Sequence, residues 1–563
     1  MSNNIIYDAI VVGSGISGGW AAKELTEKGL NVLVLERGRP VEHVKDYVTE
    51  HKGIWDFKYR NLPERELYDK EYFVQKHNHA FSELTRHYFN NDLKNPYDYN
   101  EDKPFYWLRG DVEGGRSLTW GRQVYRFSDL DFTANKKDNH GVDWPIRYDD
   151  IKAWYSYVEK FIGVSGQAEN LPQLPDSEFL PPMQFTKIEK VMKKRIEEHF
   201  DDRMMTIGRC AILTQAHNGR APCHYCGPCH RGCMTGSYFS SQSSTLPAAK
   251  KTGNLTIRTH SVVDKLIYNP QTKRVDGVSI IDAQSREKIV FNSKLVFLCA
   301  STVGSTQLLL NSTSESFPNG LANNSGVLGH YLMDHTIGIA AMGVMPGNEE
   351  DYHYGNRPNG TYIPRFKNLD KQQTSFLRGY GYQGWGMRMD WRSTHAAKKG
   401  FGKDFKEEMQ QPGPWGVGLI GFGECLPRFE NHMRLSDTKV DSYGIPQIEF
   451  HFEWSKNELE MREDIAKEGK AMLEACGARD ITTSTHIHPG GGAIHEMGTA
   501  RMGHDPKTSV LNKYNQCHDV ANLFVTDGSC MTSASCVNPS LTYMALTARA
   551  VDYAVKQFAK EFS

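Results

Sequence analysis

A glycine-rich loop near the start of the chain constrains the fold more than any other feature of the sequence. Gly13, Gly15 and Gly18 form a G-x-G-x-x-G pattern that follows the apolar run Ile6–Val12, and apolar residues then recur at helical spacing. In a strand–turn–helix unit, the first glycine allows a tight turn, the second lets the backbone approach a pyrophosphate, and the third lets helix and strand pack closely. The pyrophosphate would lie at the helix N-terminus, where free N–H groups and the dipole favour negative charge. The alternative is a glycine turn in an ordinary α/β unit.

The segment after this loop strengthens the dinucleotide interpretation. Val32–Leu35 is predicted to form a second buried strand that ends at Glu36. A carboxylate at that place accepts hydrogen bonds from ribose hydroxyls and repels a 2′-phosphate, which disfavours NADP. Ser14 in the loop and Arg37 after the strand are further candidates for cofactor binding, together with the residues Val263 and Ala300.

A short strand near the C-terminus favours FAD over a nicotinamide cofactor. The apolar run Leu523–Val525 leads into Asp527 and Gly528. In flavoproteins a strand of this kind closes the sheet, and its aspartate binds the ribityl chain or a phosphate of FAD. The alternative is a strand that leads into a turn, for which Asp-Gly is common.

Size and charge exclude several classes of protein. A chain of 563 residues with a formal net charge of −1 is expected to form two domains, and neither nucleic acid nor an anionic membrane surface would attract it strongly. No run of 18 apolar residues is present, so no membrane-spanning helix is expected, and the first residues lack the positive charge of an export signal. Seven cysteines are scattered singly, as in buried thiols of a reducing compartment.

The other four cysteines form a cluster of a different kind. Cys223, Cys226, Cys229 and Cys233 follow the spacing C-x2-C-x2-C-x3-C. Adjacent side chains in so short a run are poorly placed for two disulfides, and a structural zinc site usually takes two separated pairs of ligands. The spacing is that of bacterial ferredoxin cysteines, with either a 3Fe-4S or a 4Fe-4S cluster, and Arg231 would raise its potential. Zinc binding and reduced structural thiols remain alternatives.

Four stretches of the sequence together resemble the glucose–methanol–choline oxidoreductase family. They are Gly13–Glu36, Gly114–Gly121, His495–Gly503 and Asp527–Ala550, and they cover about a third of the chain. The resemblance implies an α/β fold in which a Rossmann-like FAD-binding domain is interleaved with a β-sheet substrate-binding domain. It also implies that Gly114, Gly115 and Ser117 lie along the flavin. Relatives with covalent FAD carry a histidine where Thr119 stands, so a non-covalent flavin is expected.

The resemblance also indicates a catalytic pair. His495 lies in a glycine-rich loop, and Asn538 stands 43 positions later, where the family carries a histidine or an asparagine. We expect His495 to be the general base and Asn538 to hold the substrate oxygen beside it. The alternatives are a buried histidine satisfied by the backbone, and an Asn538 that caps the helix after Pro539. That helix would direct N–H groups of Ser540 and Leu541 toward the flavin.

The expected domains alternate along the chain. FAD-binding segments are 1–40, 105–142, 210–335 and 485–563; the third contains the cysteine-rich insert at 221–235, and the fourth the catalytic loop. Substrate-binding segments are 143–209 and 336–484, and residues 41–104 form an insertion or lid.

Cluster-bearing members of the family oxidise sugars or sugar acids, which implies a dehydrogenase for a sugar or glycoside, with oxidation at C3 of a glycoside favoured. Gluconate, another polyol, and C1 of glucose are alternatives. The resemblance implies a c-type cytochrome as electron acceptor and a small accessory subunit whose signal exports the folded enzyme to the periplasm; residence in the cytoplasm is the alternative. An oxygen-using oxidase with a structural zinc, and a non-catalytic flavin-binding subunit, are the remaining alternatives.

Overall fold

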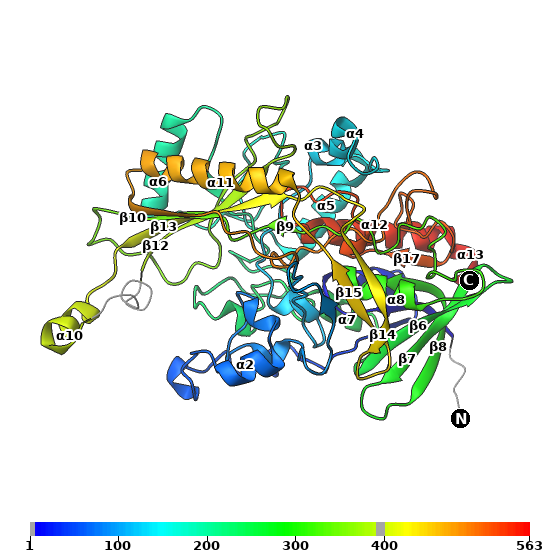
Figure 1. The fold of residues 1–563 in the computed structure, drawn as a ribbon. Helices are drawn as coiled ribbons and strands as arrows, with labels where there is room; N and C mark the ends of the chain where they lie inside the picture. The colour runs from blue at the N-terminus through cyan, green and yellow to red at the C-terminus, as the bar shows by residue number, and fades with distance from the viewer. Residues whose placement is uncertain (1–5, 390–399, 563) are drawn as a thin grey trace.

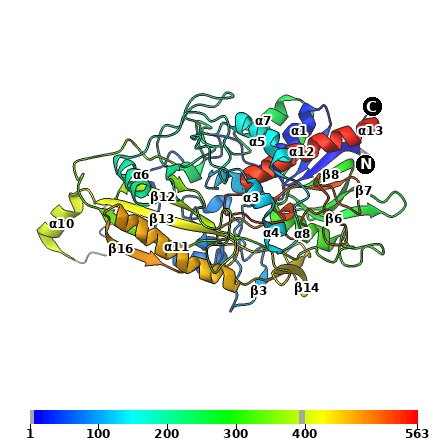
Figure 2. The ribbon, with the colours of Figure 1, turned by 90° about the horizontal axis from the view of Figure 1, so that it is seen from above.

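Two sheets, one mainly parallel and one antiparallel, organise the chain. The structure, a computed structural model, describes residues 6–389 and 400–562. The parallel sheet lies at the end of the molecule that carries both termini, and the antiparallel sheet lies at the other end (Figures 1 and 2). The prediction of an α/β fold with two interleaved parts is confirmed.

The first sheet contains the predicted dinucleotide-binding strands in the order β5-β2-β1-β8, and continues through β7 and β6. Its members are β1 (Ile6–Val12), β2 (Val32–Leu35), β5 (Leu255–Arg258), β6 (Ser261–Asn269), β7 (Arg274–Asp282), β8 (Lys288–Leu298) and β17 (Leu523–Val525). The long strand β8 pairs antiparallel with β7 in its first half and parallel with β17 in its second half. The C-terminal strand β17 therefore joins the same sheet as the N-terminal strand β1, with β8 between them, as the sequence predicted.

Helices cover one face of this sheet because their small and apolar residues face it. Ala21, Ala22 and Leu25 of α1 (Ile16–Glu27) are fully buried against strand residues such as Phe524. Helix α12 (Ser540–Gln557) packs against α1 and against α5 (Tyr148–Ile162), while α7 (Thr245–Lys251) packs against α1. Helix α8 (Ser301–Asn311) packs on β6. The first turns of α1 and α12 both begin at the cavity described below.

The second sheet has the order β16-β10-β13-β12-β11-β4, with β9 beside β13. Its strands are β4 (Thr206–Ile207), β9 (His335–Thr336), β10 (Ala340–Met345), β11 (Thr361–Ile363), β12 (Tyr380–Arg388), β13 (Trp415–Glu424) and β16 (Arg479–Ser484). Helix α11 (Lys456–Ala475) lies across one face and contacts α6 (Lys187–His199) (Figure 2). A side chain at Gly421 would come within 2.2 Å of Ile465, so this glycine allows α11 to lie close to the sheet.

The remaining elements are short. A small sheet joins β14 (His432–Val440) and β15 (Pro446–His451) to β3 (Asp98–Tyr99). The other α-helices are α2 (Arg65–Glu71), α3 (Asp129–Phe132), α4 (Ala134–Asp138), α10 (Gly402–Gln410) and α13 (Ala559–Phe562). Short 3-10 turns lie, among other places, at Gly115–Leu118 and within the cysteine-rich loop at Cys229–Arg231.

Candidate active site

A long cavity runs from the N-terminal glycine loop to the C-terminal histidine loop. Predicted cofactor and catalytic residues that line it are Gly13, Ser14, Gly15, Glu36, Arg37, Gly115, Ser117, Val263, Ala300, His495, Asp527, Gly528, Asn538, Pro539 and Ser540. The structure thus brings together residues from both ends and the middle of the chain. Gly18, Gly114, Thr119 and Leu541 do not line it.

The residues outside the cavity support its walls. A Cβ atom on Gly18 would lie 1.9 Å from the carbonyl oxygen of Gly13, so this glycine permits the close contact between helix and strand. Gly114 has a φ of 88° and donates its N–H to Ser14 Oγ at 2.8 Å. Leu541 is buried in the core, and Thr119 is buried directly after a 3-10 turn.

The glycine loop and Glu36 form one hydrogen-bonded unit. Ser14 donates to Glu36 Oε2 from its backbone N–H at 3.1 Å and from its hydroxyl at 2.5 Å, while Gly38 N–H donates to Oε1 at 2.8 Å. Burial raises the pKa of Glu36 above its ordinary value, against the lowering effect of these donors. Gly15 has no atom within 3.9 Å of an ideal Cβ position, so this start of α1 is open for a pyrophosphate, which fits FAD.

Asp527 occupies the opposite wall. Its Oδ1 accepts from the N–H and hydroxyl of Ser529 at 3.0 and 2.6 Å, and its Oδ2 accepts from the Ser305 hydroxyl. Ser305 also accepts the N–H of Ala300 at 3.1 Å, so the loop after β8 and the loop after β17 are joined. Burial raises the pKa of the Asp527 carboxyl.

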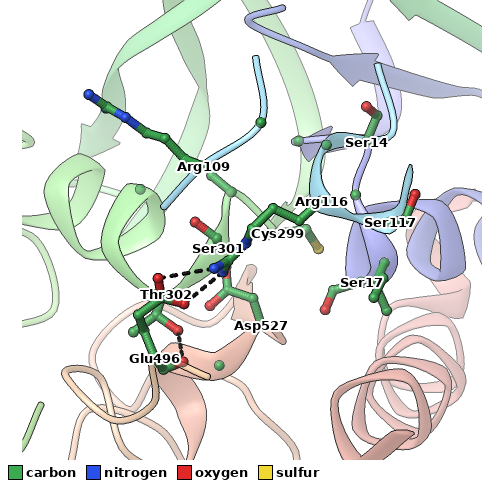
Figure 3. Close-up of a pocket in the computed structure, with 18 of the residues that line it drawn as sticks. Ser14, Ser17, Arg109, Arg116, Ser117, Cys299, Ser301, Thr302, Glu496 and Asp527 are labelled. Carbon is green, nitrogen blue, oxygen red and sulfur yellow. Dashed lines mark hydrogen bonds and ion pairs between the residues drawn. The ribbon is translucent and has the colours of Figure 1, made fainter. Parts of the chain in front are cut away.

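An ion pair between two distant loops crosses the middle of the cavity. Arg116 reaches Glu496 with nitrogen–oxygen distances of 2.8 and 3.0 Å, and Thr302 donates its hydroxyl to the Glu496 carbonyl oxygen (Figure 3). The carboxylate is almost fully buried. The pair fixes the residue next to His495 against the Gly115–Leu118 turn, a connection that no local sequence pattern predicted.

Three side chains form a hydrogen-bonded row at the catalytic end. His495 Nδ1 lies 2.9 Å from His335 Nδ1, and His495 Nε2 lies 3.2 Å from Asn538 Nδ2. On its far side, His335 Nε2 lies 2.9 Å from the carbonyl oxygen of Ser535 and 3.2 Å from that of Ala534.

This row fixes the proton positions. A carbonyl oxygen only accepts, so His335 Nε2 carries a proton, and neutral His335 Nδ1 is then an acceptor. His495 must therefore donate from Nδ1, which leaves a lone pair on Nε2. Burial lowers the pKa of His335 to about 4. Burial, then the charges of His335, Arg116 and His79, hold the pKa of His495 well below 6.5, so both imidazoles are neutral at pH 7.

Asn538 does not act as a helix cap. Helix α12 begins at Ser540 after Pro539, with no side-chain cap. The amide is oriented instead by Gln383, whose Nε2 donates to Asn538 Oδ1 at 2.8 Å, so that Nδ2 faces His495. The capping alternative is wrong because the amide is engaged in the active site.

His335 and Gln383 were not predicted from the sequence. They come from β9 and β12 of the antiparallel sheet, and His335 precedes its partner by 160 positions. Only the pairing of strands and loops in three dimensions places them beside the catalytic pair.

The four clustered cysteines lie near one another without forming a metal site. All four have free thiols, and burial, with a smaller contribution from the neighbouring thiols, raises the pKa of Cys223 to about 11. Within residues 6–389 and 400–562, no three histidine, cysteine or acidic side chains have a metal-binding arrangement. The four thiols have the chemistry of cluster ligands and lie near one another, but they do not point to a common centre. Arg231, expected to tune the potential, donates to the carbonyl oxygens of Thr49 and Lys52.

Comparison with protein families gives two matches. A model described as GMC oxidoreductase matches residues 7–337, and a second model of the same description matches residues 427–547. No helix within the described part of the chain has the length and apolar character needed to span a bilayer.

Several bacterial proteins resemble the whole chain. A 2-methyl-1,2-propanediol dehydrogenase of Mycolicibacterium austroafricanum is 28% identical, over 98% of this chain and 96% of its own length. The fructose dehydrogenase large subunit of Gluconobacter japonicus is 24% identical over 98% of both chains. The gluconate 2-dehydrogenase flavoprotein of Pantoea cypripedii is 24% identical, over 96% of this chain and 92% of its own.

Solved structures share the fold at low sequence identity. Pyridoxine 4-oxidase from Mesorbium loti superposes with a TM-score of 0.60 at 14% identity, over 97% of this chain and 98% of its own. A variant of formate oxidase from Aspergillus oryzae has a TM-score of 0.58 at 13% identity, over the full length of both chains.

Proposed function

The chain belongs to the GMC oxidoreductase family, FAD-dependent enzymes that act on CH–OH groups, and we propose that it is a dehydrogenase of a sugar or related polyol. The observation that carries the proposal is the row His335–His495–Asn538, which meets the glycine-lined cavity with His495 Nε2 as an unprotonated acceptor that Asn538 Nδ2 faces.

The row supplies what the oxidation of an alcohol requires. Conversion of CH–OH to C=O removes one proton and one hydride, and bound FAD supplies the hydride acceptor at its N5 atom. His495 Nε2 takes the hydroxyl proton as general base. Asn538 Nδ2, held toward His495 by Gln383, donates to the substrate oxygen and positions it. His335 keeps the proton of His495 on Nδ1 and so keeps the base at Nε2.

The cavity wall next to Asn538 favours negative charge. Helix α12 begins at Ser540, and Pro539 and Ser540 line the cavity. The free N–H groups of this first turn and the helix dipole stabilise an anion placed there by about 0.3–1 kcal/mol. This is the end of the cavity at which the flavin ring would accept negative charge.

We propose that FAD is bound without a covalent link. Thr119, which stands where covalent relatives carry a histidine, is buried and lies outside the cavity. Acid precipitation of the protein should release all of the FAD into the supernatant; FAD that stays with the precipitate would contradict the proposal.

For the substrate, we propose a sugar or glycoside, with oxidation at C3 of a glycoside favoured and gluconate, another polyol or glucose C1 as alternatives. The relatives are named as dehydrogenases of fructose, gluconate and a propanediol, which supports a substrate that carries several hydroxyl groups.

We propose that electrons leave through an iron–sulfur cluster held by Cys223, Cys226, Cys229 and Cys233. Their ferredoxin-like spacing and their mutual proximity support this, although the thiols must turn toward a common centre to bind iron. A c-type cytochrome would then receive the electrons. We further propose that a small accessory subunit brings the enzyme to the periplasm; one relative is itself named a large subunit.

Two other functions remain candidates. If the four cysteines hold zinc, the enzyme has no relay and is better suited to pass electrons to oxygen as an oxidase. A non-catalytic flavin-binding subunit is disfavoured by the complete catalytic row, which such a subunit does not need.

The experiment is to purify the protein without oxygen, measure iron, sulfide and zinc, and follow oxidation of glucose, methyl glucoside and gluconate. Cytochrome c, an artificial quinone acceptor and oxygen are compared as electron acceptors. Iron and sulfide with a preference for cytochrome or quinone would support the relay dehydrogenase. Zinc with formation of hydrogen peroxide would support the oxidase, and no turnover with any polyol would contradict the proposed function.

A further inference from the structure

A second cavity of about 890 Å³ lies beside the flavin cavity. It is bounded by residues 61–85 of the insertion on one side and by residues 227–231 of the cysteine loop on the other. Arg122 lines this cavity as well as the flavin cavity, so the two meet at its side chain.

Arg122 is a buried cation without a counter-charge. The residue is 5% exposed, its Nε and Nη1 atoms have no hydrogen-bond partner, and no carboxylate in the described part of the chain lies within ion-pairing distance. Its guanidinium lies 4.4 Å from the ring centre of Tyr238, which stabilises it only in part. Burying a charge without a partner is costly. A ligand of opposite charge would therefore be bound favourably beside Arg122.

The backbone at Arg122 also indicates a functional constraint. Its φ is 60°, a left-handed conformation that is unfavourable for a residue other than glycine. The N–H of Ala211 donates to the Arg122 carbonyl oxygen at 2.9 Å and holds this conformation. The conformation accompanies a side chain that lies between the two cavities.

The rest of the second cavity favours an anion. Four cationic side chains line it, namely Arg65, Lys76, Arg122 and Arg231, against one carboxylate, Asp69. Lys76 and Asp69 already pair with each other at 2.6 Å. His79 and His77, which also line the cavity, add no charge at pH 7, because burial lowers the pKa of His79 to about 4 and also lowers that of His77.

This cavity adjoins the catalytic end of the first. Arg122 and His495 both line the first cavity, and Arg122 and His79 line the second. A ligand that places one end at Arg122 can therefore extend toward His495 with the other.

We propose that the second cavity binds the acidic end of the substrate, and that Arg122 pairs with a carboxylate while a hydroxyl of the same molecule lies at His495. The substrate class is then a sugar acid, either an aldonate or a glycoside of a uronic acid, in place of a neutral sugar. This rests on the proposed function for the hydroxyl end of the molecule, but the anion site stands on Arg122 alone.

Cys229 is the one clustered cysteine that lines the cavity. An anionic cluster on the four thiols is a separate source of negative charge, and the experiment must distinguish it from a carboxylate.

The experiment uses D-gluconate and D-sorbitol, which share a carbon skeleton and differ in a carboxylate against a CH₂OH group. Binding is measured by calorimetry under anaerobic conditions, and reduction of bound FAD by rapid mixing. Because a charged hydrogen-bonded pair is at stake, we expect gluconate to be favoured in binding and in kcat/KM by about 10- to 100-fold. Higher ionic strength should weaken only gluconate.

Two variants and a control complete the test. Arg122→Gln should remove the preference by weakening gluconate much more than sorbitol, while Arg122→Lys, which keeps the charge, should retain part of it. Arg203→Gln removes a comparably buried guanidinium, one that is paired with Glu468 at 2.8 Å, and should leave the preference intact. Iron and FAD content are measured for every variant.

Equal binding of gluconate and sorbitol, or an equal loss of both in Arg122→Gln at unchanged FAD content, would overturn the inference. So would a loss of iron in Arg122→Gln without a change in gluconate binding, since Arg122 would then serve the cluster. If gluconate binds through Arg122 but neither polyol reduces the flavin, the anion site is supported and the proposed oxidation is contradicted.

Discussion

The histidine loop and the cysteine loop contain the two groups of reactive side chains in this molecule, and they differ in how complete they are. At the histidine loop, four consecutive hydrogen bonds of 2.8–3.2 Å join the Ser535 carbonyl to Gln383. At the cysteine loop, four free thiols lie close together, and no three side chains in the described residues are arranged for a metal.

The difference follows from what holds each loop. His335, His495 and Asn538 are fixed by a sheet strand, the buried Arg116–Glu496 pair and the start of α12, which are parts of the folded core. The cysteine loop has little regular structure beyond one 3-10 turn, and the metal that we propose there would have to bring its thiols to a common centre. The histidine row is thus preformed by the fold, whereas the proposed metal site would be completed by its metal.

The largest effect is expected at the preformed site. His495→Asn removes the base but can still form hydrogen bonds, so the rate of flavin reduction by substrate should fall by about 10²- to 10⁴-fold. Rapid mixing without oxygen measures the rate, and FAD content and melting temperature should stay near those of the parent. A loss of less than tenfold would exclude His495 as the base.

A smaller loss is expected from the residue behind the base. His335→Leu frees His495 to place its proton on either nitrogen, and flavin reduction should slow by about 10- to 100-fold, less than a fully misplaced tautomer costs in a catalytic triad. His335→Gln can both accept from His495 and donate to the Ser535 carbonyl, so it should recover part of the rate. Equal losses in both variants would show that His335 only fills space.

The cysteine loop should respond in the opposite way. Cys226→Ser should abolish iron binding and electron transfer to cytochrome, yet leave flavin reduction within about twofold, as for an exposed position away from the core. Cys476→Ser, at the buried cysteine that ends α11, is the control and should keep its iron. Retention of full iron in Cys226→Ser would remove this residue from the ligand set.

The smallest effect concerns pH. His495 acts as a base only when neutral, and its pKa is held well below 6.5 by burial and by nearby charges, so kcat/KM should be flat from neutral pH upward. The rate should fall only on the acid side, as pH passes down through this lowered pKa. A midpoint at or above about 6.5, the ordinary value for histidine, would contradict the neutral, buried base.

Local patterns were enough to predict the nucleotide half of the site. Gly13 and Gly18 form the close helix–strand contact that their spacing predicted, and Leu523–Val525 joins the same sheet. These features depend on short-range geometry, in which a few residues determine a turn, a strand and the start of a helix.

Contacts between distant strands could not be predicted in this way. His335 and Gln383 reach the catalytic pair only because β9 and β12 both lie beside β13. The role of Arg122 was also hidden, because its importance lies in the absence of a partner, which only the packed structure reveals. Asn538 was predicted with two alternative roles, and the start of α12 at Ser540, with no side-chain cap, excludes the capping role.

The absorption spectrum of the native protein, purified without oxygen, tests the central claim most directly. We expect flavin absorption bands at about 370 and 450 nm. The band at about 450 nm should disappear when a sugar acid or other polyol is added in the absence of any acceptor. A protein that carries flavin but is not bleached by any such alcohol, while His495 and Asn538 are intact, would contradict the assignment of the row as an alcohol-oxidising site. A protein without flavin would contradict the account from its glycine loop onward.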